Sequence, residues 1–171
     1  MDEQEILSKN EIPKKNIEDE WFKKVNYFVA RISKMEKGKD RATKVSSFLL
    51  KCQFVEFVLK KLIRELYRYA IEYKPSVIFD LSKKSGYIDG LTFGQTINFE
   101  LKNFFSPEVL ELIPNLQKLN SKRTQLNHKL FEEKSTMKEI DAVAQEGILL
   151  MDIILNQMNK LLKIVRGSSK L

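Results

Sequence analysis

The sequence predicts an all-α protein, a bundle of four or five helices. Three observations lead to this fold class. Apolar residues recur at spacings of three and four over long segments, which is the period of a helix buried along one face. Glycine and proline are scarce, six and four in 171 residues, and lie mostly between these segments. Serine or threonine stands before several of the segments, where its hydroxyl can cap a first helical turn.

The first half of the chain contains two expected helices and a turn-rich segment. One helix covers about residues 18 to 36, with Trp21 and Ile32 on its apolar stripe. The next covers about 40 to 73 and ends before Pro75, because proline lacks the amide hydrogen that a continuing helix needs. Residues 75 to 92 are rich in turn-forming residues and are expected to hold a short helix or an extended piece.

The middle of the chain carries two helix start signals. Thr92 is the expected N-cap of a helix over 93 to 105. Ser106, with proline directly after it, is the expected N-cap of a helix over about 107 to 131. Pro114 is placed to kink or divide that second helix.

The last helix is predicted from its two ends. Thr136 and Glu139 have the spacing of a capping box, in which each side chain bonds the backbone of the other. The helix should run over about 137 to 166, with Gly167 as its C-cap. The apolar stripes of the helices are wider than one core needs, so they fit either a core alone or a core with a dimer face.

Length and composition set the domain organisation. The 171 residues fit one helical domain over 18 to 167, with a flexible charged segment at 1 to 17 and a tail at 168 to 171. The acidic start lacks the apolar core of a signal peptide, and no stretch reaches the roughly 20 apolar residues of a membrane span. We therefore expect a cytoplasmic protein with no membrane partner.

The counts of cysteine and histidine narrow the chemistry. With one cysteine, Cys52, and one histidine, His128, the chain has neither a disulfide framework nor a metal site built from several such residues. No metal and no cofactor is predicted. Cys52 lies in an apolar helical stretch, which favours an inert buried thiol over a catalytic partner of His128.

One constellation suggests catalysis. Arg123 lies five positions before His128, among polar residues. The Arg guanidinium is a planar fork that matches phosphate oxygens, and His is the side chain whose ordinary pKa lies near neutrality. A phosphate clamp beside a proton-transfer group is sufficient for metal-free cleavage of RNA, in which the 2′-hydroxyl attacks its own phosphorus. The alternative is a surface histidine and an arginine that share a helix by accident.

The spacing poses a geometric problem. In a straight helix five residues advance about 500°, so Arg123 and His128 point roughly 140° apart. Arg123 shares a face with Asn127, and Thr124 shares a face with His128. Two remedies exist: the helix ends or bends between them, or a two-fold partner supplies a second copy of the motif.

These residues resemble the signature of the HEPN superfamily of all-helical proteins, in which Arg is followed after four to six residues by His. Arg123 and His128 match as they stand, and Thr124 replaces the Asn that often follows the Arg. The segment LTFGQTI is similar to a stretch that often opens a helix upstream of the motif. The helix carrying FVEFVLKKLIREL resembles the earlier helix of the family, which often carries an acidic residue; Glu56 is the nearest match. The resemblance covers about residues 40 to 165.

The resemblance implies an HEPN-like bundle and a metal-independent endoribonuclease, usually a homodimer whose motifs meet across a cleft. Arg123 would hold the scissile phosphate and His128 would transfer the proton, with Thr124, Asn127 and Asn120 orienting substrate or imidazole. Many such proteins are toxins with an antitoxin partner or effectors of phage defence by abortive infection. The superfamily also has inactive members, so a non-catalytic module that binds RNA, a nucleotide or a protein is the alternative.

Charge gives a weaker indication of an RNA partner. The net charge of +7 fits a phosphate-bearing partner, but it also fits a protein that lysine keeps soluble. Lys60, Arg64 and Arg68 recur every four residues on the long second helix and could follow an RNA backbone. The alternative, which we favour, is a solvated helix face with ordinary ion pairs.

Overall fold

The computed structural model describes residues 14–38, 40–73, 81–132 and 135–168. Every element in these ranges is helical and none is a strand, which confirms the all-α class. In chain order the elements are α2 (Lys14–Glu36), α3 (Arg41–Tyr73), α4 (Leu81–Gly90), α5 (Phe93–Gln95), the π-helical turn η1 (Thr96–Glu100), the 3₁₀ turn η2 (Leu101–Asn103), α6 (Pro107–Phe131) and α7 (Met137–Ser168).

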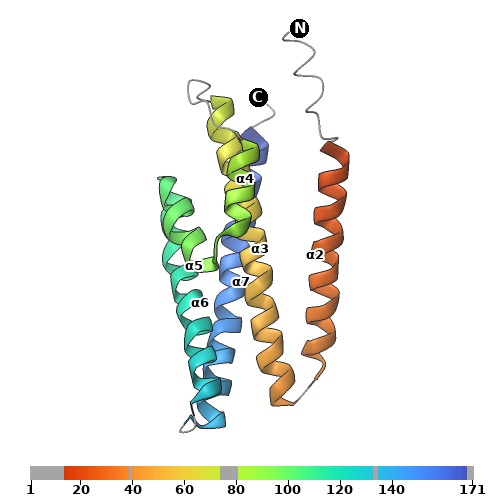
Figure 1. The fold of residues 1–171 in the computed structure, drawn as a ribbon, viewed down its shortest axis with the longest axis vertical. Coiled ribbons are helices and arrows are strands. Elements are labelled where there is room, and N and C mark those ends of the chain that lie inside the picture. Colours follow the sequence, from red (N-terminus) through yellow and green to blue (C-terminus); the bar gives the residue numbers. More distant parts are fainter. Residues whose placement is uncertain (1–13, 39, 74–80, 133–134, 169–171) are drawn as a thin grey trace, which may run out of the picture.

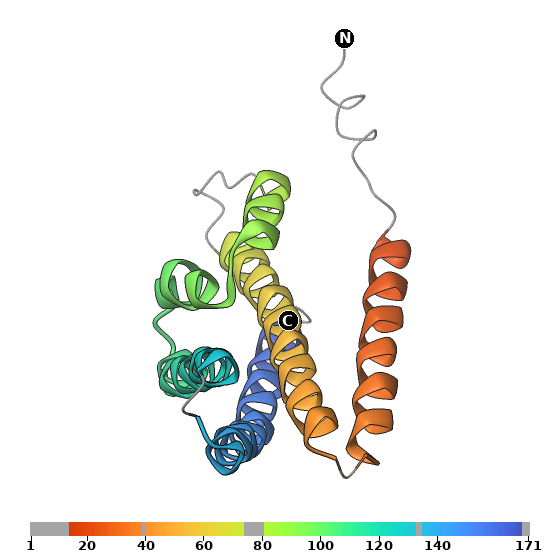
Figure 2. The same ribbon diagram turned by 60° about the horizontal axis from the view of Figure 1, so that its bottom comes forward.

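Helix α3 is the centre of the described arrangement. Helices α3 and α7 pack along much of their length, α6 packs on α7, and α2 lies against α3 on the side away from α6 (Figures 1 and 2). Most of the fully buried side chains come from α3, α6 and α7, and they include Phe48, Leu62, Leu112, Leu116, Ile154 and Met158, all 0% exposed. Full burial of each such side chain stabilises the fold by about 1.5–3 kcal/mol relative to exposure.

Helix α2 is covered less well than its apolar stripe predicts. Its aromatic side chains stack on α3, with Phe28 against Phe54 and Phe57, and Trp21 against Phe57. None of its described side chains is fully buried, and Val29 is 48% exposed. Helix α2 thus stands beside the core, and none of its described side chains belongs to it.

The predicted helix starts are confirmed by their hydrogen bonds. The Ser106 hydroxyl accepts from the Val109 amide at 3.3 Å, and Thr92 forms a capping box with Gln95. Thr136 and Glu139 form the expected box: the Thr136 amide donates to the Glu139 carboxylate at 3.0 Å, and the Glu139 amide donates to the Thr136 hydroxyl at 3.4 Å. These contacts satisfy amides that have no partner within their own helix.

One boundary prediction is wrong, and another keeps one of its two alternatives. Gly167 lies inside α7 and does not cap it, and no described glycine has the positive φ that such a cap requires. Pro114 was expected to kink or divide its helix; it does not divide α6, which continues from Pro107 to Phe131. Helix α2 begins at Lys14, so residues 14 to 17 of the expected flexible segment are helical, and residues 1–13 and 169–171 lie outside the described ones.

The segment between α3 and α6 agrees with the expectation only in part. The turn-rich stretch contains α4, the short helix that was one of its two expected forms, and this helix raises the number of helices above four or five; Pro75 lies outside the described residues. The helix expected over 93 to 105 becomes α5, η1 and η2 and ends at Asn103. The π-helical turn η1, which is wider than an α-helical turn, ends at a buried polar contact. There the Tyr67 hydroxyl donates to the Glu100 carboxylate at 2.7 Å.

No helix in the part of the chain that the structure describes has both the length and the apolar character needed to cross a bilayer.

Candidate active site at the α3–α6 contact

Helix α6 carries both Arg123 and His128. Because α6 continues without a break from Pro107 to Phe131, the helix neither ends nor divides between them. The two side chains therefore leave the helix axis roughly 140° apart, with a rise of about 7.5 Å between them. Within one chain they do not converge on a single phosphate. Of the two ways in which they could meet, a break in the helix or a second copy of the chain, only the second copy is left.

The Arg123 guanidinium is held by a carboxylate of another helix. Its Nη1 donates to Glu56 Oε2 on α3 at 3.2 Å, across 67 positions of sequence. The Arg123 side chain is 31% exposed and that of Glu56 is 19% exposed, so the pair lies at the surface edge of the α3–α6 contact. The second oxygen of the carboxylate, Oε1, lies 3.2 Å from Lys60 Nζ. Glu56 thus lies between two cations and fixes the position of the guanidinium.

Cys52 lies one helical turn before Glu56 and is 0% exposed. Burial raises the pKa of this thiol to about 12, with a smaller upward contribution from Glu56 and an opposing one from Arg123. The thiol therefore stays protonated at neutral pH and is a poor nucleophile. This confirms the expected buried cysteine and gives no support to a catalytic pair with His128, whose side chain is exposed.

His128 lies in the last turn of α6, and its imidazole makes no hydrogen bond or ion pair to the residues that the structure describes. Its backbone carbonyl accepts from the Glu132 amide at 3.1 Å, which closes the helix end. Three large apolar side chains at the same end of the bundle are exposed: Leu130 by 42%, Phe131 by 88% and Met137 by 55%. Exposed apolar residues that cluster in this way are typical of a contact surface.

The predicted orienting residues have different surroundings. The Thr124 hydroxyl donates to the Asn120 carbonyl at 3.0 Å, one turn back on its own helix. The Asn120 amide lies against Gly94, where an added Cβ would come within 3.1 Å of Asn120 Nδ2. Asn127 is exposed, and its side chain makes no hydrogen bond to a described residue. The role of Gly94 in this close approach was not predicted, because its sequence context indicates only a helix entrance.

The cations of the predicted RNA-backbone track have partners within the chain. Lys60 pairs with Glu56 and donates to the Asp89 carbonyl at 3.1 Å. Arg64 pairs with the Asp89 carboxylate of α4, and Arg68 pairs with Glu65 at 2.8 Å. These contacts are those of the ordinary ion-paired face that we favoured from the sequence. The part played by Asp89 depends on α4 folding back onto α3 and has no signal in the sequence.

The structure brings the Arg123 guanidinium and the Glu56 carboxylate together, whereas the His128 imidazole lies further along α6 and points away from them. Among the described residues no three His, Cys, Asp or Glu side chains lie close enough to hold a metal ion. A guanidinium can stabilise charge that develops on a phosphate, and an imidazole can transfer a proton.

Comparison of the chain with protein-family models, with curated proteins and with solved structures finds no match. The functional proposal therefore depends on the chemistry of these side chains and on their placement by α3 and α6.

Proposed function

We propose that this protein is a metal-independent endoribonuclease of HEPN type, with its active sites in a cleft between two copies. The observation that carries the proposal is the hydrogen bond from Arg123 to Glu56. The resemblance implies an acidic residue on the earlier helix as an accessory to the Arg-x4-His motif. The contact joins the motif to that carboxylate and keeps the guanidinium partly exposed, as binding of a phosphate requires.

Each site takes Arg123 from one copy and His128 from the other. The imidazole of His128 removes the proton of a ribose 2′-hydroxyl, and the 2′ oxygen attacks the adjacent phosphorus. The new bond joins O2′ to phosphorus, the bond from phosphorus to O5′ breaks, and the leaving oxygen takes a proton from water. Arg123 binds the phosphate oxygens and stabilises the charge that develops on them. The products are a cyclic phosphate and a free 5′-hydroxyl.

The apolar end of the bundle supports the pairing of two copies. Leu130, Phe131 and Met137 lie at the turn between α6 and α7, beside His128, and are all exposed. A two-fold contact at this turn would bury these three side chains. It would also place the His128 of each copy next to the other copy, because both copies use the same surface in an isologous interface. In this proposal the biological role is that of a toxin or a phage-defence effector controlled by an antitoxin protein.

Incubation of the purified protein with mixed RNA in excess EDTA tests the proposed activity. We expect cleavage at unchanged rate with and without EDTA, and product fragments that carry a cyclic phosphate at one end and a 5′-hydroxyl at the other. Cleavage that EDTA abolishes, or fragments with 5′-phosphate ends, would contradict the mechanism.

The second candidate is a non-catalytic module that binds RNA, a nucleotide or a protein partner at the same place. It is favoured by the intramolecular pairing of Arg123 with Glu56, since such an ion pair also serves a purely structural role. Binding of RNA that weakens with added salt, with no cleavage at any protein concentration, would establish this candidate.

Glu56 is expected to act as a positioning residue. Glu56→Ala should lower the cleavage rate about tenfold, because the guanidinium loses the charge-assisted hydrogen bond that fixes it. Glu56→Gln keeps an oxygen acceptor and should retain most of the activity. Glu146→Ala is the matched control, since it removes the exposed partner of Lys122, the neighbour of Arg123. Equal rates for Glu56→Ala and wild type would exclude the positioning role.

A further inference from the structure

A groove runs between α2 and α7, with α3 as its floor. Both helices pack on α3, but no extensive contact joins α2 to α7. Two hollows of about 330 and 160 Å³ lie end to end in this groove and share Lys51 as a lining residue. The groove is on the side of α3 away from α6, so it is separate from the candidate active site (Figure 2).

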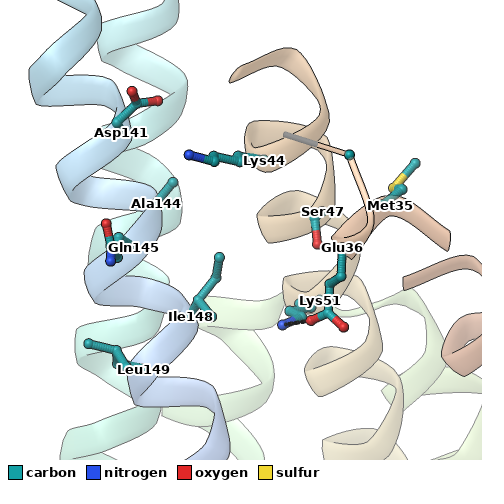
Figure 3. A pocket seen from close by; sticks show the side chains of 11 residues that line it. Met35, Glu36, Lys44, Ser47, Lys51, Asp141, Ala144, Gln145, Ile148 and Leu149 are labelled. Atoms are coloured by element: carbon teal, nitrogen blue, oxygen red, sulfur yellow. Dashed lines mark ion pairs between the residues drawn. The ribbon is translucent and has the colours of Figure 1, made fainter. Parts of the chain in front are cut away.

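The larger hollow contains three polar side chains without a partner among the described residues. Lys44 and Ser47 come from α3, and Gln145 comes from α7 (Figure 3). The Ser47 residue is 3% exposed, and its hydroxyl makes no hydrogen bond. A buried hydroxyl without a partner costs free energy, so it is a place where a ligand atom is expected. The Lys44 ammonium forms no ion pair with a described residue and reaches across the hollow toward α7 (Figure 3).

These three groups define the chemistry of a head group. An ammonium, a hydroxyl and an amide can all donate hydrogen bonds, so together they suit an oxygen anion. Two carboxylates limit the charge of that anion: Glu36, which is paired with Lys51, and Asp141 also line the hollow. A single negative charge therefore fits better than two.

The smaller hollow is mostly apolar, although Ser33 and Asp152 also line it, and it continues from the first. Its lining includes Val29 and Ile32 of α2, Phe54 of α3 and Leu155 of α7. Val29 is 48% exposed, so a tail lying here would bury surface that the fold leaves open. From Lys44 to Phe54 the floor helix rises about 15 Å over its ten residues, which suits an extended alkyl chain of moderate length.

We propose that this groove binds a single-chain amphiphile with a monoanionic head, such as a carboxylate or a sulfate monoester. Its head group meets Lys44 and Ser47, and its chain lies over Val29 and Phe54. The combined volume is at the lower end of the range for ligand sites, roughly 300 Å³ upward, which excludes large or branched lipids. This inference does not depend on the proposed ribonuclease activity.

Titration calorimetry of the full chain tests the proposal. Decanoate and decyl sulfate should bind at one site, while decyltrimethylammonium and decyl maltoside should bind at least about tenfold more weakly, because neither neutral nor cationic heads suit the donors. Lys44→Met should weaken decanoate binding about tenfold by removing the charged donor. Lys160→Met, on the exposed outer face of α7, is the matched control and should leave binding unchanged. If decanoate binding weakened equally in both lysine variants, the binding would reflect nonspecific attraction to a basic protein, and the proposal would be overturned.

Two further variants separate binding from folding. Val29→Asp, at an exposed position, should abolish decanoate binding while leaving the helical circular dichroism unchanged. Ser47→Ala should weaken binding without lowering the unfolding temperature, because it removes a hydroxyl that has no partner in the free protein. Binding that ignores the head charge, or that survives Val29→Asp, would contradict the assignment, as would the absence of binding at millimolar concentration.

Discussion

His128→Ala is expected to lower the rate of RNA cleavage about 10²- to 10⁴-fold, the usual contribution of a positioned proton-transfer group. The exposed imidazole makes no hydrogen bond or ion pair to the described residues, so its loss should leave the stability of the fold unchanged. Arg123→Ala should lower the rate by about 10²- to 10³-fold, because the developing charge on the phosphate loses its cationic partner. The measurement is the initial rate on a fluorescent RNA in EDTA.

Gln125→Ala is the control for both variants, since Gln125 is an exposed polar residue of the same helix between the two motif positions. It should cleave at the wild-type rate. If His128→Ala retained wild-type activity while remaining folded, the catalytic assignment would be lost, and any cleavage would have to come from elsewhere in the preparation or the chain.

Gly147→Ala is expected to destabilise the fold, although alanine favours a helix. A Cβ at Gly147 would lie 2.1 Å from Cε2 of Phe48, which is 0% exposed and cannot move aside freely. Overpacking of this kind costs about 1–3 kcal/mol, and up to about 1 kcal/mol of it is offset by helix propensity. Urea unfolding should show a lower midpoint with an unchanged slope.

Gly167→Ala supplies the matched control on the same helix. Nothing lies within 4 Å of an added Cβ there, so this variant should gain up to about 1 kcal/mol. In a Phe48→Leu background the cost of Gly147→Ala should shrink, because the two positions are in contact and their effects are coupled. A stabilising Gly147→Ala would show that α3 and α7 do not approach as closely as described.

Local signals in the sequence were sufficient for the helix starts. A capping residue and the backbone amide that bonds to it lie within four positions of each other in the sequence. Helix starts can therefore be predicted without knowing the fold, here from Thr92, Ser106 and Thr136. Helix α4 was expected only as one of two alternatives. Its sequence LSKKSGYIDG contains two glycines, and its contacts with α3, including Asp89 with Arg64, arise only once the chain folds back.

The candidate site was only partly accessible from the sequence. The types and spacing of Arg123 and His128 suggest phosphate chemistry, but the partner of Arg123 lies 67 positions away, and only the resemblance indicated Glu56. The contact of Gly94 with Asn120 and that of Gly147 with Phe48 depend on the distance between two packed helices. The spacing of apolar residues within one helix does not predict that distance. The groove beside α2 was missed for the same reason.

The pairing of Arg123 from one chain with His128 from another is the central claim, and mixing two inactive variants tests it. Arg123→Ala and His128→Ala proteins are unfolded and refolded together in equal amounts. Half of the resulting dimers contain both variants, and each of these keeps one of its two sites intact, so the mixture should recover about a quarter of wild-type cleavage. If the mixture stays as inactive as either variant alone, Arg123 and His128 do not act across a dimer interface.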